Sequence, residues 1–349
     1  MKALTFHGKE LIKFESVNDP VVIQDTDVIV KVRLSCICGS DLHVYHGRER
    51  GIDVGTAMGH EFVGEIVERG EAVRQLNAGD LVMCPFTTNC GECYYCHIGL
   101  TCRCERGQLF GWVEEGKGLP GAQAEYVRVP LAESTLMKIP EGVSCEEGLL
   151  LGDIFSTGFY CAHQAEVNSK GIYAIVGCGP VGMMTIVGAR ELGAENIFVI
   201  DQVEERLAMG SAFGAIPINL TRQNPLEIIK EHSGGRGADA VMEAVGSNGA
   251  GRLAYELVRP GGIISTVGVC TDSDLAFSPA EAYDKNLTFR VGRCPARHLM
   301  ERLVPVVQEK KYPLTDVISH RMKLDEGAHA YRMFANREDN CLKVLLEVG

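Results

Sequence analysis

The stretch Gly171-Ile-Tyr-Ala-Ile-Val-Gly-Cys-Gly-Pro-Val-Gly182 places a short apolar run directly before three closely spaced glycines. Apolar residues resume with helical spacing after the glycines, which predicts a strand, a tight turn and the start of a helix. Gly177, Gly179 and Gly182 fit the pattern G-x-G-x-x-G. In that pattern the first glycine allows the turn, the second lets backbone approach a pyrophosphate, and the third lets helix pack on strand. The pattern alone is equally compatible with a glycine-rich turn between core elements.

A second buried strand follows and strengthens the dinucleotide interpretation. Asn196-Ile-Phe-Val-Ile-Asp201 ends in a carboxylate about twenty residues beyond the glycines. Asp201 could accept hydrogen bonds from the ribose hydroxyls of NAD, and it would repel the extra phosphate of NADP. The pyrophosphate would lie at the helix N-terminus formed by Pro180 and Val181, where free N–H groups and the helix dipole compensate its charge. The sequence therefore predicts a site that prefers NAD.

The bulk composition limits the possible partners and location. A chain of 349 residues is long enough for two domains. Its formal net charge of −12 argues against a nucleic-acid or anionic-membrane surface. No signal peptide is evident, and the 14 cysteines indicate metal binding or free thiols in a reducing compartment, so we expect a cytoplasmic protein. Residues 171–189 are uncharged, but their glycines favour a buried strand and helix over a membrane span.

The rhythm of the chain changes between its parts. Alternating runs at 27–33, 61–67 and 122–129 predict a compact, mostly β domain at the start. A helical pattern at 146–165 leads into buried strands that alternate with helices, which predicts βαβ crossovers and a parallel sheet. The strands are expected at 173–176, 197–200, 240–244, 263–267 and 287–290, and the helices at 181–192, 204–213, 225–232 and 252–257. A further helix is expected near 299–309, and the apolar strand at 341–348 should return to the first domain.

Four cysteines form the most specific motif in the chain. Cys90, Cys93, Cys96 and Cys104 have the spacing C-x2-C-x2-C-x7-C. Four thiolates within one loop can close a tetrahedral zinc shell, and a closed shell leaves no open position, so this metal would be structural. Free thiols and an iron–sulfur cluster are the alternatives. Cys102 lies in the same loop and is interpreted as a bystander.

Two other compact clusters supply thiolate, hydroxyl, carboxylate and imidazole groups. They are Cys38, Ser40, Asp41 and His43 in the first cluster, and His60 and Glu61 in the second. An isolated cysteine or histidine is usually core or surface. Two such clusters in one β domain, however, are what a catalytic metal with one open position requires.

With these motifs the sequence resembles the zinc-dependent medium-chain alcohol dehydrogenase family over essentially its whole length. The resemblance implies an α/β protein with a GroES-like, mostly β catalytic domain (residues 1–155 and 291–349). It also implies a Rossmann domain with a doubly wound parallel sheet (residues 156–290) and an active site in the cleft between the two. The implied activity is hydride transfer between NAD and an alcohol, with secondary alcohols, diols and polyols as expected substrates. The implied assembly is a homodimer or homotetramer.

The resemblance also assigns the catalytic zinc ligands. Cys38 and His60 would be two of them, and the third should fall within residues 152–158. Many family members have cysteine there, whereas this chain has Asp153. Asp153 keeps an anionic ligand, so Cys38, Asp153 and neutral His60 still balance a divalent ion. A similar aspartate occurs in the formaldehyde dehydrogenase and dismutase branch, but this chain looks too short for that branch's inserted loop.

Four neighbouring residues receive roles by the same motif positions. Asp41 would orient His60. Glu61 would be either a fourth ligand displaced by substrate or a charge beside the site. Ser40 would take the substrate proton and pass it through the cofactor ribose to His43. Ser40 could equally be a turn serine that caps the next helix.

Two cations complete the implied cofactor site: Lys343 would add charge at the pyrophosphate, and Arg206 would line the adenosine side. Both could instead be plain surface charges. Two other functions compete with the dehydrogenase. One is a redox-neutral isomerase or dismutase that retains NAD. The other is a non-catalytic, zinc-stabilised binding protein, which should have lost ligands, whereas every expected ligand position here holds a competent residue.

Overall fold

The computed structural model describes residues 1–349 and divides into two compact units. Unit 1 comprises Met1–Asp153 and Pro295–Gly349, and unit 2 comprises Ile154–Cys294. The sequence predicts the changes of domain at 155/156 and 290/291. The structure places the first at 153/154, where a helix is interrupted, and the second at 294/295, just before a helix of unit 1 begins.

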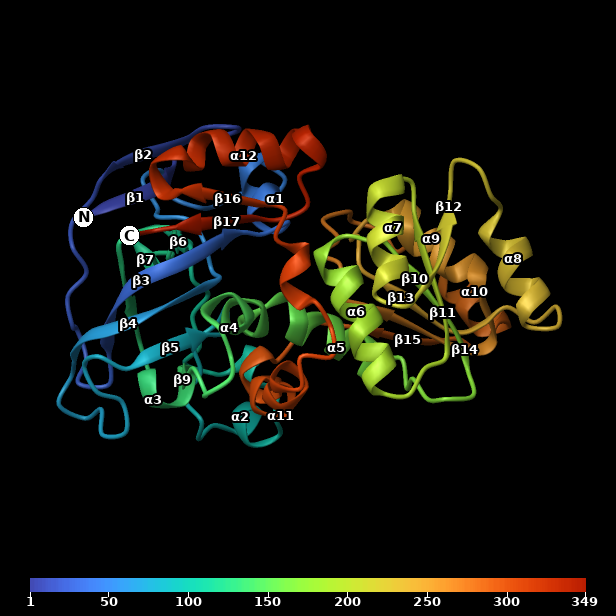
Figure 1. Ribbon diagram of the computed structural model, residues 1–349, viewed down its shortest axis with the longest axis horizontal. Helices are drawn as coiled ribbons and strands as arrows, with labels where there is room; N and C mark the ends of the chain where they lie inside the picture. The colour runs from blue at the N-terminus through green and yellow to red at the C-terminus, as the bar shows by residue number, and fades with distance from the viewer. The chain divides into compact units, whose positions relative to one another are not determined.

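Unit 1 is built on a seven-stranded sheet, whose labelled strands run from blue through cyan and green to red in Figure 1. Its strand order is β16-β17-β3-β4-β5-β9, and β8 also pairs with β3. The bounds are β3 (Val28–Ile37), β4 (Phe62–Arg69), β5 (Leu81–Cys84), β8 (Tyr126–Val129), β9 (Met137–Lys138), β16 (His320–Lys323) and β17 (Val344–Glu347). Strand β17 pairs antiparallel with β3, with Val344 opposite Ile37. The expected return of the C-terminal apolar run to the first domain is therefore confirmed.

Alternation along β3 builds the core of this sheet. Val28, Val30 and Val32 are at most 1% exposed, and they pack in one apolar cluster with Phe62 and Ile66 of β4. Successive side chains of a strand point to opposite faces, so every second residue from Val28 to Val32 enters the same core.

Short elements surround the sheet of unit 1. The strands are β1 (Lys2–Phe6), β2 (Ile12–Ser16), β6 (Trp112–Glu114) and β7 (Lys117–Leu119). The α-helices are α1 (Asp41–Tyr45), α2 (Tyr94–His97), α3 (Ala132–Thr135), α4 (Cys145–Gly152), α11 (Ala296–Gln308) and α12 (Gly327–Asn336). The 3-10 helices are η1 (Thr101–Arg103), η2 (Leu314–Val317), η3 (Leu324–Glu326) and η4 (Glu338–Asn340).

Unit 2 contains a six-stranded sheet in which all neighbouring strands are parallel. Its order is β12-β11-β10-β13-β14-β15. The strand bounds are β10 (Ile172–Val176), β11 (Asn196–Asp201), β12 (Ile216–Asn219), β13 (Ala238–Glu243), β14 (Val258–Thr266) and β15 (Thr288–Val291). The helices are α5 (Ile154–Gln164), α6 (Pro180–Glu191), α7 (Glu204–Ala212), α8 (Pro225–His232), α9 (Asn248–Leu257) and α10 (Pro279–Asp284). This doubly wound parallel sheet confirms the predicted Rossmann class.

Both faces of this sheet are covered. Ala174 and Val176 of β10 pack in one cluster with Ala254 and Leu257 of α9. The intervening Ile175 is also completely buried, and it lies on the side of α6. Figure 1 accordingly shows α6 and α7 on the near side of the strands and α9 and α10 beyond them. From β10 the chain first adds β11 and β12 on one side and then β13 to β15 on the other. The loops after β10 and β13 therefore run in opposite directions, and parallel sheets of this kind bind ligands between such loops.

Two features of the fold differ from the sequence prediction. Strand β12 was not predicted, because it is only four residues long, carries Pro217 and lies at the edge of the sheet. The helical pattern predicted at 146–165 is two helices, since Asp153 has φ −142° and ψ −81° and interrupts it. Residues 171–189, uncharged in the sequence, form β10 and most of α6. No helix in the chain combines the length and apolarity that crossing a membrane requires.

Candidate metal and cofactor sites

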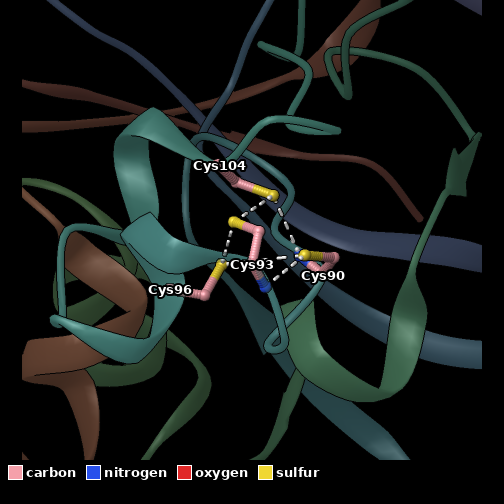
Figure 2. Close-up of side chains that lie close together, drawn as sticks. All are labelled: Cys90, Cys93, Cys96 and Cys104. Atoms are coloured by element: carbon pink, nitrogen blue, oxygen red, sulfur yellow. Dashed lines mark hydrogen bonds between the residues drawn. The ribbon is translucent and has the colours of Figure 1, made fainter.

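The cysteine loop of unit 1 brings four sulfur atoms together. Sγ of Cys93 lies 3.6 Å from Sγ of Cys96 and 4.0 Å from Sγ of Cys104, and the Sγ atoms of Cys90 and Cys96 are 3.9 Å apart (Figure 2). Four sulfurs at about 2.3 Å from one tetrahedral ion would be separated by about 3.8 Å. The observed spacing therefore fits a zinc ion. Cys102 is buried in η1 and does not belong to this group.

Backbone N–H groups already favour thiolate character in this loop. The N–H of Cys93 donates to Sγ of Cys90 at 3.3 Å, and that of Cys90 donates to Sγ of Cys104 at 3.2 Å. Although burial opposes the shift, such N–H groups and Arg106 lower the pKa of Cys90 to about 6. Burial raises the pKa of Cys96 to about 12, so a bound cation is needed to hold all four sulfurs as thiolates.

A second group gathers at one end of the unit 1 sheet. Cys38 follows β3, while His60 and Glu61 precede β4, the antiparallel neighbour of β3. Asp153 joins them from the interruption after α4, where a Cβ on Gly152 would lie 2.2 Å from the carbonyl oxygen of Cys84. That close approach requires glycine and seats the end of α4 against β5. One ligand atom from each of the four residues lies within 4.8 Å of the others.

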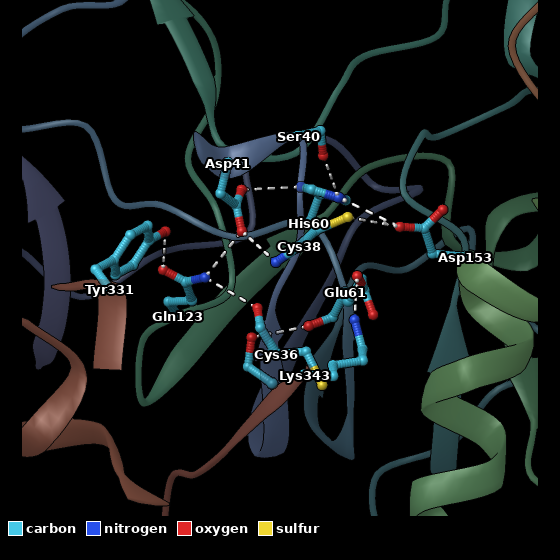
Figure 3. Close-up of polar contacts among 11 residues, drawn as sticks. Cys36, Cys38, Ser40, Asp41, His60, Glu61, Gln123, Asp153, Tyr331 and Lys343 are labelled. Carbon is cyan, nitrogen blue, oxygen red and sulfur yellow. Dashed lines mark hydrogen bonds and ion pairs between the residues drawn. The ribbon is translucent and has the colours of Figure 1, made fainter. Parts of the chain in front are cut away.

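The distances within this group suit a shared cation. Oδ2 of Asp153 lies 3.5 Å from Sγ of Cys38 and 3.4 Å from Nε2 of His60 (Figure 3). The side chains of His60 and Asp153 are only 12% and 11% exposed. Burial and Asp153 raise the pKa of Cys38 to about 11. Burial by itself would lower the pKa of His60, but Asp41 and Asp153 raise it well above its ordinary value. Acidic side chains and a thiol thus lie together at a position that is shielded from water.

Asp41 and Ser40 lie beside the same point, and His43 follows them in α1. Oδ1 of Asp41 lies 3.2 Å from Nδ1 of His60, as expected for an orienting carboxylate. Oγ of Ser40 lies 3.3 Å from Nε2 of His60, and Ser40 makes no side-chain bond to the N-terminus of α1. The helix-cap alternative for Ser40 therefore does not hold. Nδ1 of His43 is buried without a partner, and burial lowers the pKa of His43.

Lys343 is buried in unit 1 beside Glu61. Its Nζ donates to Oε1 of Glu61 at 2.8 Å, and the two side chains are 1% and 0% exposed. The neighbouring carboxylate raises the pKa of Lys343 despite burial, whereas burial raises the pKa of Glu61. Lys343 is therefore the counter-ion of Glu61 inside unit 1, while its contact with a pyrophosphate stays a prediction. Lys343 directly precedes β17, which pairs with β3, so the lysine lies close to the end of β3 where Cys38 follows.

Each of the three glycines in the G-x-G-x-x-G motif of unit 2 has a different structural role. Gly177 has φ +97°, a left-handed conformation that favours glycine. A Cβ on Gly182 would lie 1.9 Å from the carbonyl oxygen of Gly177, so only glycine lets α6 begin this close to β10. A Cβ on Gly179 would meet nothing within 4 Å. The protein therefore leaves space beside Gly179, at the start of α6, where no side chain caps the helix.

Asp201 accepts backbone hydrogen bonds that the sequence analysis does not predict. Its Oδ2 accepts from the N–H of Cys178 at 2.8 Å, and its Oδ1 accepts from Gln202 and Val203 at 2.7 and 3.0 Å. The carboxylate thus fastens the glycine loop to the end of β11. Arg206 lies on α7, and its carbonyl oxygen accepts from Sγ of Cys178 at 3.1 Å.

Glu243, at the end of β13, is a candidate site residue that the sequence analysis did not predict. It is 2% exposed, and its Oε1 accepts from the N–H groups of Val245 and Gly246 at 2.7 and 2.8 Å. Strand β13 adjoins β10, so Glu243 shapes the loop beside the glycine turn. The signal in the sequence was a carboxylate at the end of a buried strand, the same signal that identified Asp201.

Comparison with known proteins identifies two family domains and several relatives of this chain. Residues 24–141 match the alcohol dehydrogenase GroES-like domain, and residues 180–309 match the zinc-binding dehydrogenase domain. Zinc-type alcohol dehydrogenase B of Aspergillus flavus is 38% identical over 99% of this chain and 80% of its own length. The medium chain reductase/dehydrogenase ucsI of Acremonium sp. is 44% identical over 81% of this chain and 98% of its own. The structure of alcohol dehydrogenase TADH from Thermus sp. ATN1 has a TM-score of 0.93 and 38% identity, covering 100% of both chains.

These likenesses define a zinc-type oxidoreductase made of a GroES-like domain and a Rossmann-like domain. The chain belongs to the zinc-dependent medium-chain alcohol dehydrogenase family. Its reaction is the transfer of hydride between an alcohol and a nicotinamide cofactor, and neither the redox-neutral nor the non-catalytic alternative is favoured.

Proposed function

We propose that this chain is an NAD-dependent dehydrogenase of secondary alcohols, diols or polyols, with catalytic zinc on Cys38, His60 and Asp153. The observation that carries the proposal is the convergence of one sulfur, one nitrogen and one carboxylate oxygen at a buried point. A second, structural zinc would be held by the four-cysteine loop.

The donor set fits the metal in composition and charge. Three protein ligands leave one position open, as catalytic zinc sites do. Three anionic groups (Cys38, Glu61 and Asp153) face one lysine, Lys343, so a divalent cation makes the buried group neutral. Oε2 of Glu61 is buried and has no hydrogen-bond partner, which supports a further cation nearby. Zinc held there would polarise the substrate oxygen, and NAD would accept the hydride.

Ser40 and His43 are the proposed proton carriers. The Ser40 hydroxyl lies beside His60 and is not used as a helix cap, so it is available to take a proton from a substrate hydroxyl. His43 has its pKa lowered by burial, so it is neutral near pH 7 and can accept that proton. Its unpartnered Nδ1 supports this assignment.

The cofactor preference rests on unit 2. The uncapped start of α6 and the space beside Gly179 suit a pyrophosphate near Pro180 and Val181. Asp201 supports NAD over NADP, because its negative charge would repel a ribose phosphate. Arg206 on α7 remains the proposed neighbour of the adenosine.

A homodimer or homotetramer is proposed for the assembly. Strand β15 forms one edge of the unit 2 sheet, and Val291 in it is 62% exposed. An unpaired edge is a template for pairing with a second copy. Light scattering that gave the mass of one 37.9 kDa chain would contradict this proposal.

The catalytic assignment is tested with Asp153→Ala. We expect zinc content to fall from two ions per chain to one, and NADH formation to be lost, because a ligand is removed from an open site. Cys102→Ser is the control, since Cys102 lies in the cysteine loop but outside both ligand groups, and it should keep both ions. Full activity with two zinc ions in Asp153→Ala would refute the assignment.

A screen of primary alcohols, secondary alcohols, diols and polyols by NADH absorbance tests the substrate class. Cofactor retained through purification without net NADH would favour the redox-neutral alternative.

A further inference from the structure

Two buried residues continue the hydrogen-bond network behind His60. Oη of Tyr331, on α12, donates to Oε1 of Gln123 at 2.8 Å. Nε2 of Gln123 donates to the carbonyl oxygen of Cys36 at 2.9 Å and to Oδ2 of Asp41 at 3.3 Å. Figure 3 shows these groups in a row that leads from Tyr331 to His60. Tyr331 and Gln123 are both 0% exposed, so water does not substitute for either bond.

The chemistry of the partners determines how the Gln123 amide is oriented. A backbone carbonyl and an ionised carboxylate only accept, so Nε2 must face Cys36 and Asp41. Oε1 then faces Tyr331, and the phenol must donate. Burial and the charge of Asp41 raise the pKa of Tyr331 well above its ordinary value, so it keeps the proton that it donates. Each bond in the row therefore has a fixed donor and acceptor: Tyr331 donates to Gln123, and Gln123 donates to Asp41.

Asp41 is held by this row so that one oxygen remains for His60. Its Oδ2 accepts from the N–H of Cys38 at 2.9 Å and from Gln123, while Oδ1 lies 3.2 Å from Nδ1 of His60. With Oδ2 occupied, the carboxylate does not rotate away from the imidazole. With zinc bound, His60 would be neutral with its proton on Nδ1, and the lone pair of Nε2, which lies 3.4 Å from Oδ2 of Asp153, would face the ion.

Gln123 also packs against the backbone that carries His60. Its N–H donates to the carbonyl oxygen of Met58 at 2.8 Å. A Cβ on Gly59, which has φ +91°, would lie 2.4 Å from Cγ of Gln123. Glutamine at 123 and glycine at 59 are therefore fitted to each other next to the imidazole.

We propose that Gln123 and Tyr331 are positioning residues for the catalytic zinc, acting through Asp41 on the orientation of His60. The inference rests on the proposed function, because it takes His60 as a zinc ligand. Neither residue contacts the ligand group itself: Gln123 contacts Asp41, and Tyr331 contacts Gln123. Together they determine how tightly the site holds zinc, in addition to contributing to the core.

The test compares Gln123→Met and Tyr331→Phe, which remove hydrogen bonds with little change in volume. Zinc affinity is measured by chelator competition on the full-length protein, and the catalytic site is also read from the visible spectrum of the cobalt-substituted protein. We expect Gln123→Met to weaken catalytic-site zinc binding about 10- to 100-fold, the range typical of residues that support metal-bound histidines. Tyr331→Phe should weaken it about two- to tenfold, because it removes one neutral bond. The cysteine-loop zinc serves as an internal reference.

Tyr45→Phe is the matched control. The Tyr45 ring lies 5.5 Å from that of Tyr331 and is also buried, but it takes no part in the row of bonds. It should leave both zinc affinities and the cobalt spectrum unchanged. A double-mutant cycle with Asp41→Asn separates positioning from packing. If Gln123 acts through Asp41, Gln123→Met should have little further effect on zinc in that background.

Three results would overturn the proposal: unchanged zinc affinity and cobalt spectrum in both variants, equal loss at both metal sites, or additive effects in the cycle. Should Gln123→Met fail to fold, Tyr331→Phe alone decides by the same criteria. Failure of the proposed function is distinguishable, because Asp153→Ala would then keep both zinc ions. If Asp153→Ala loses one ion while Gln123→Met loses none, only the positioning inference is wrong.

Discussion

Replacing Lys343 with methionine would leave Glu61 as a carboxylate without a counter-ion in the interior of unit 1. The Nζ–Oε1 distance is 2.8 Å, and the side chains are 1% and 0% exposed. Coulomb's law gives about 6 kcal/mol for this distance at an effective dielectric constant of about 20. Measured losses for breaking buried pairs are about 3–5 kcal/mol, because the remaining group relaxes or takes up a proton. We expect Lys343→Met to lower the free energy of unfolding by about 3–5 kcal/mol.

Urea unfolding followed by tryptophan fluorescence is a suitable assay. The chain has one tryptophan, Trp112 in β6, so the signal reports unit 1 alone. With a slope of about 2–3 kcal/mol per molar urea, the midpoint should fall by roughly 1–2.5 M. Lys310→Met is the control, because Lys310 pairs with Glu147 but is 51% exposed. Exposed pairs contribute about 1 kcal/mol or less.

A double variant gives the sharper comparison. Lys343→Met with Glu61→Gln removes both charges, so most of the lost stability should return. In Lys343→Met, the loss of unfolding free energy should be larger after zinc is removed with a chelator than with zinc present. A divalent ion would replace part of the lysine's positive charge beside Glu61. A Lys343→Met midpoint equal to that of the Lys310 control, or a double variant no more stable than the single one, would refute the reasoning.

Two further predictions concern the cofactor and the cysteine loop. Asp201→Asn removes the charge but can keep one acceptor oxygen for Gln202 and Val203. The ratio of kcat/KM for NAD to kcat/KM for NADP should therefore fall about tenfold or more. Steady-state kinetics with both cofactors measure this ratio, and an equal loss for both cofactors would reject the role of Asp201. Cys93→Ser should remove one zinc ion and open residues 90–104 to proteases, because three cysteines do not close the shell. Zinc analysis with limited proteolysis measures it, and an intact, protease-resistant loop with two zinc ions would contradict a structural metal.

Much of unit 2 could be predicted because its signals are local. Strand β10, the glycine turn and α6 follow from apolar runs and from glycines whose requirement is visible within a few residues. Helix α8 has the predicted bounds, since Asn224 caps its first turn and Pro225 begins it. Strand β12 could not be predicted in this way, because it is held by pairing with β11 and its own sequence, with Pro217, disfavours a strand.

The interruption at Asp153 shows why one part of the catalytic group was harder to place. The sequence indicates a helix throughout 146–165, and Gly152 by itself is only a weak local signal of a break. The structure interrupts it because the end of α4 packs on β5, where Gly152 meets the carbonyl oxygen of Cys84. The family resemblance predicts Asp153 as a ligand, but only this packing explains how the carboxylate reaches Cys38 and His60.

The sequence by itself determined the features that act over short stretches of chain: the four-cysteine loop, the glycine fingerprint and the carboxylate of Asp201. Their chemistry depends on spacing along the backbone, which the chain carries before it folds. Only the tertiary structure decided which distant side chains meet. Lys343 pairs with Glu61 across 282 positions, and Tyr331 reaches Gln123 across 208. Such buried polar pairs form because packed strands and helices exclude water, so each group bonds to the few partners that the assembled core places beside it.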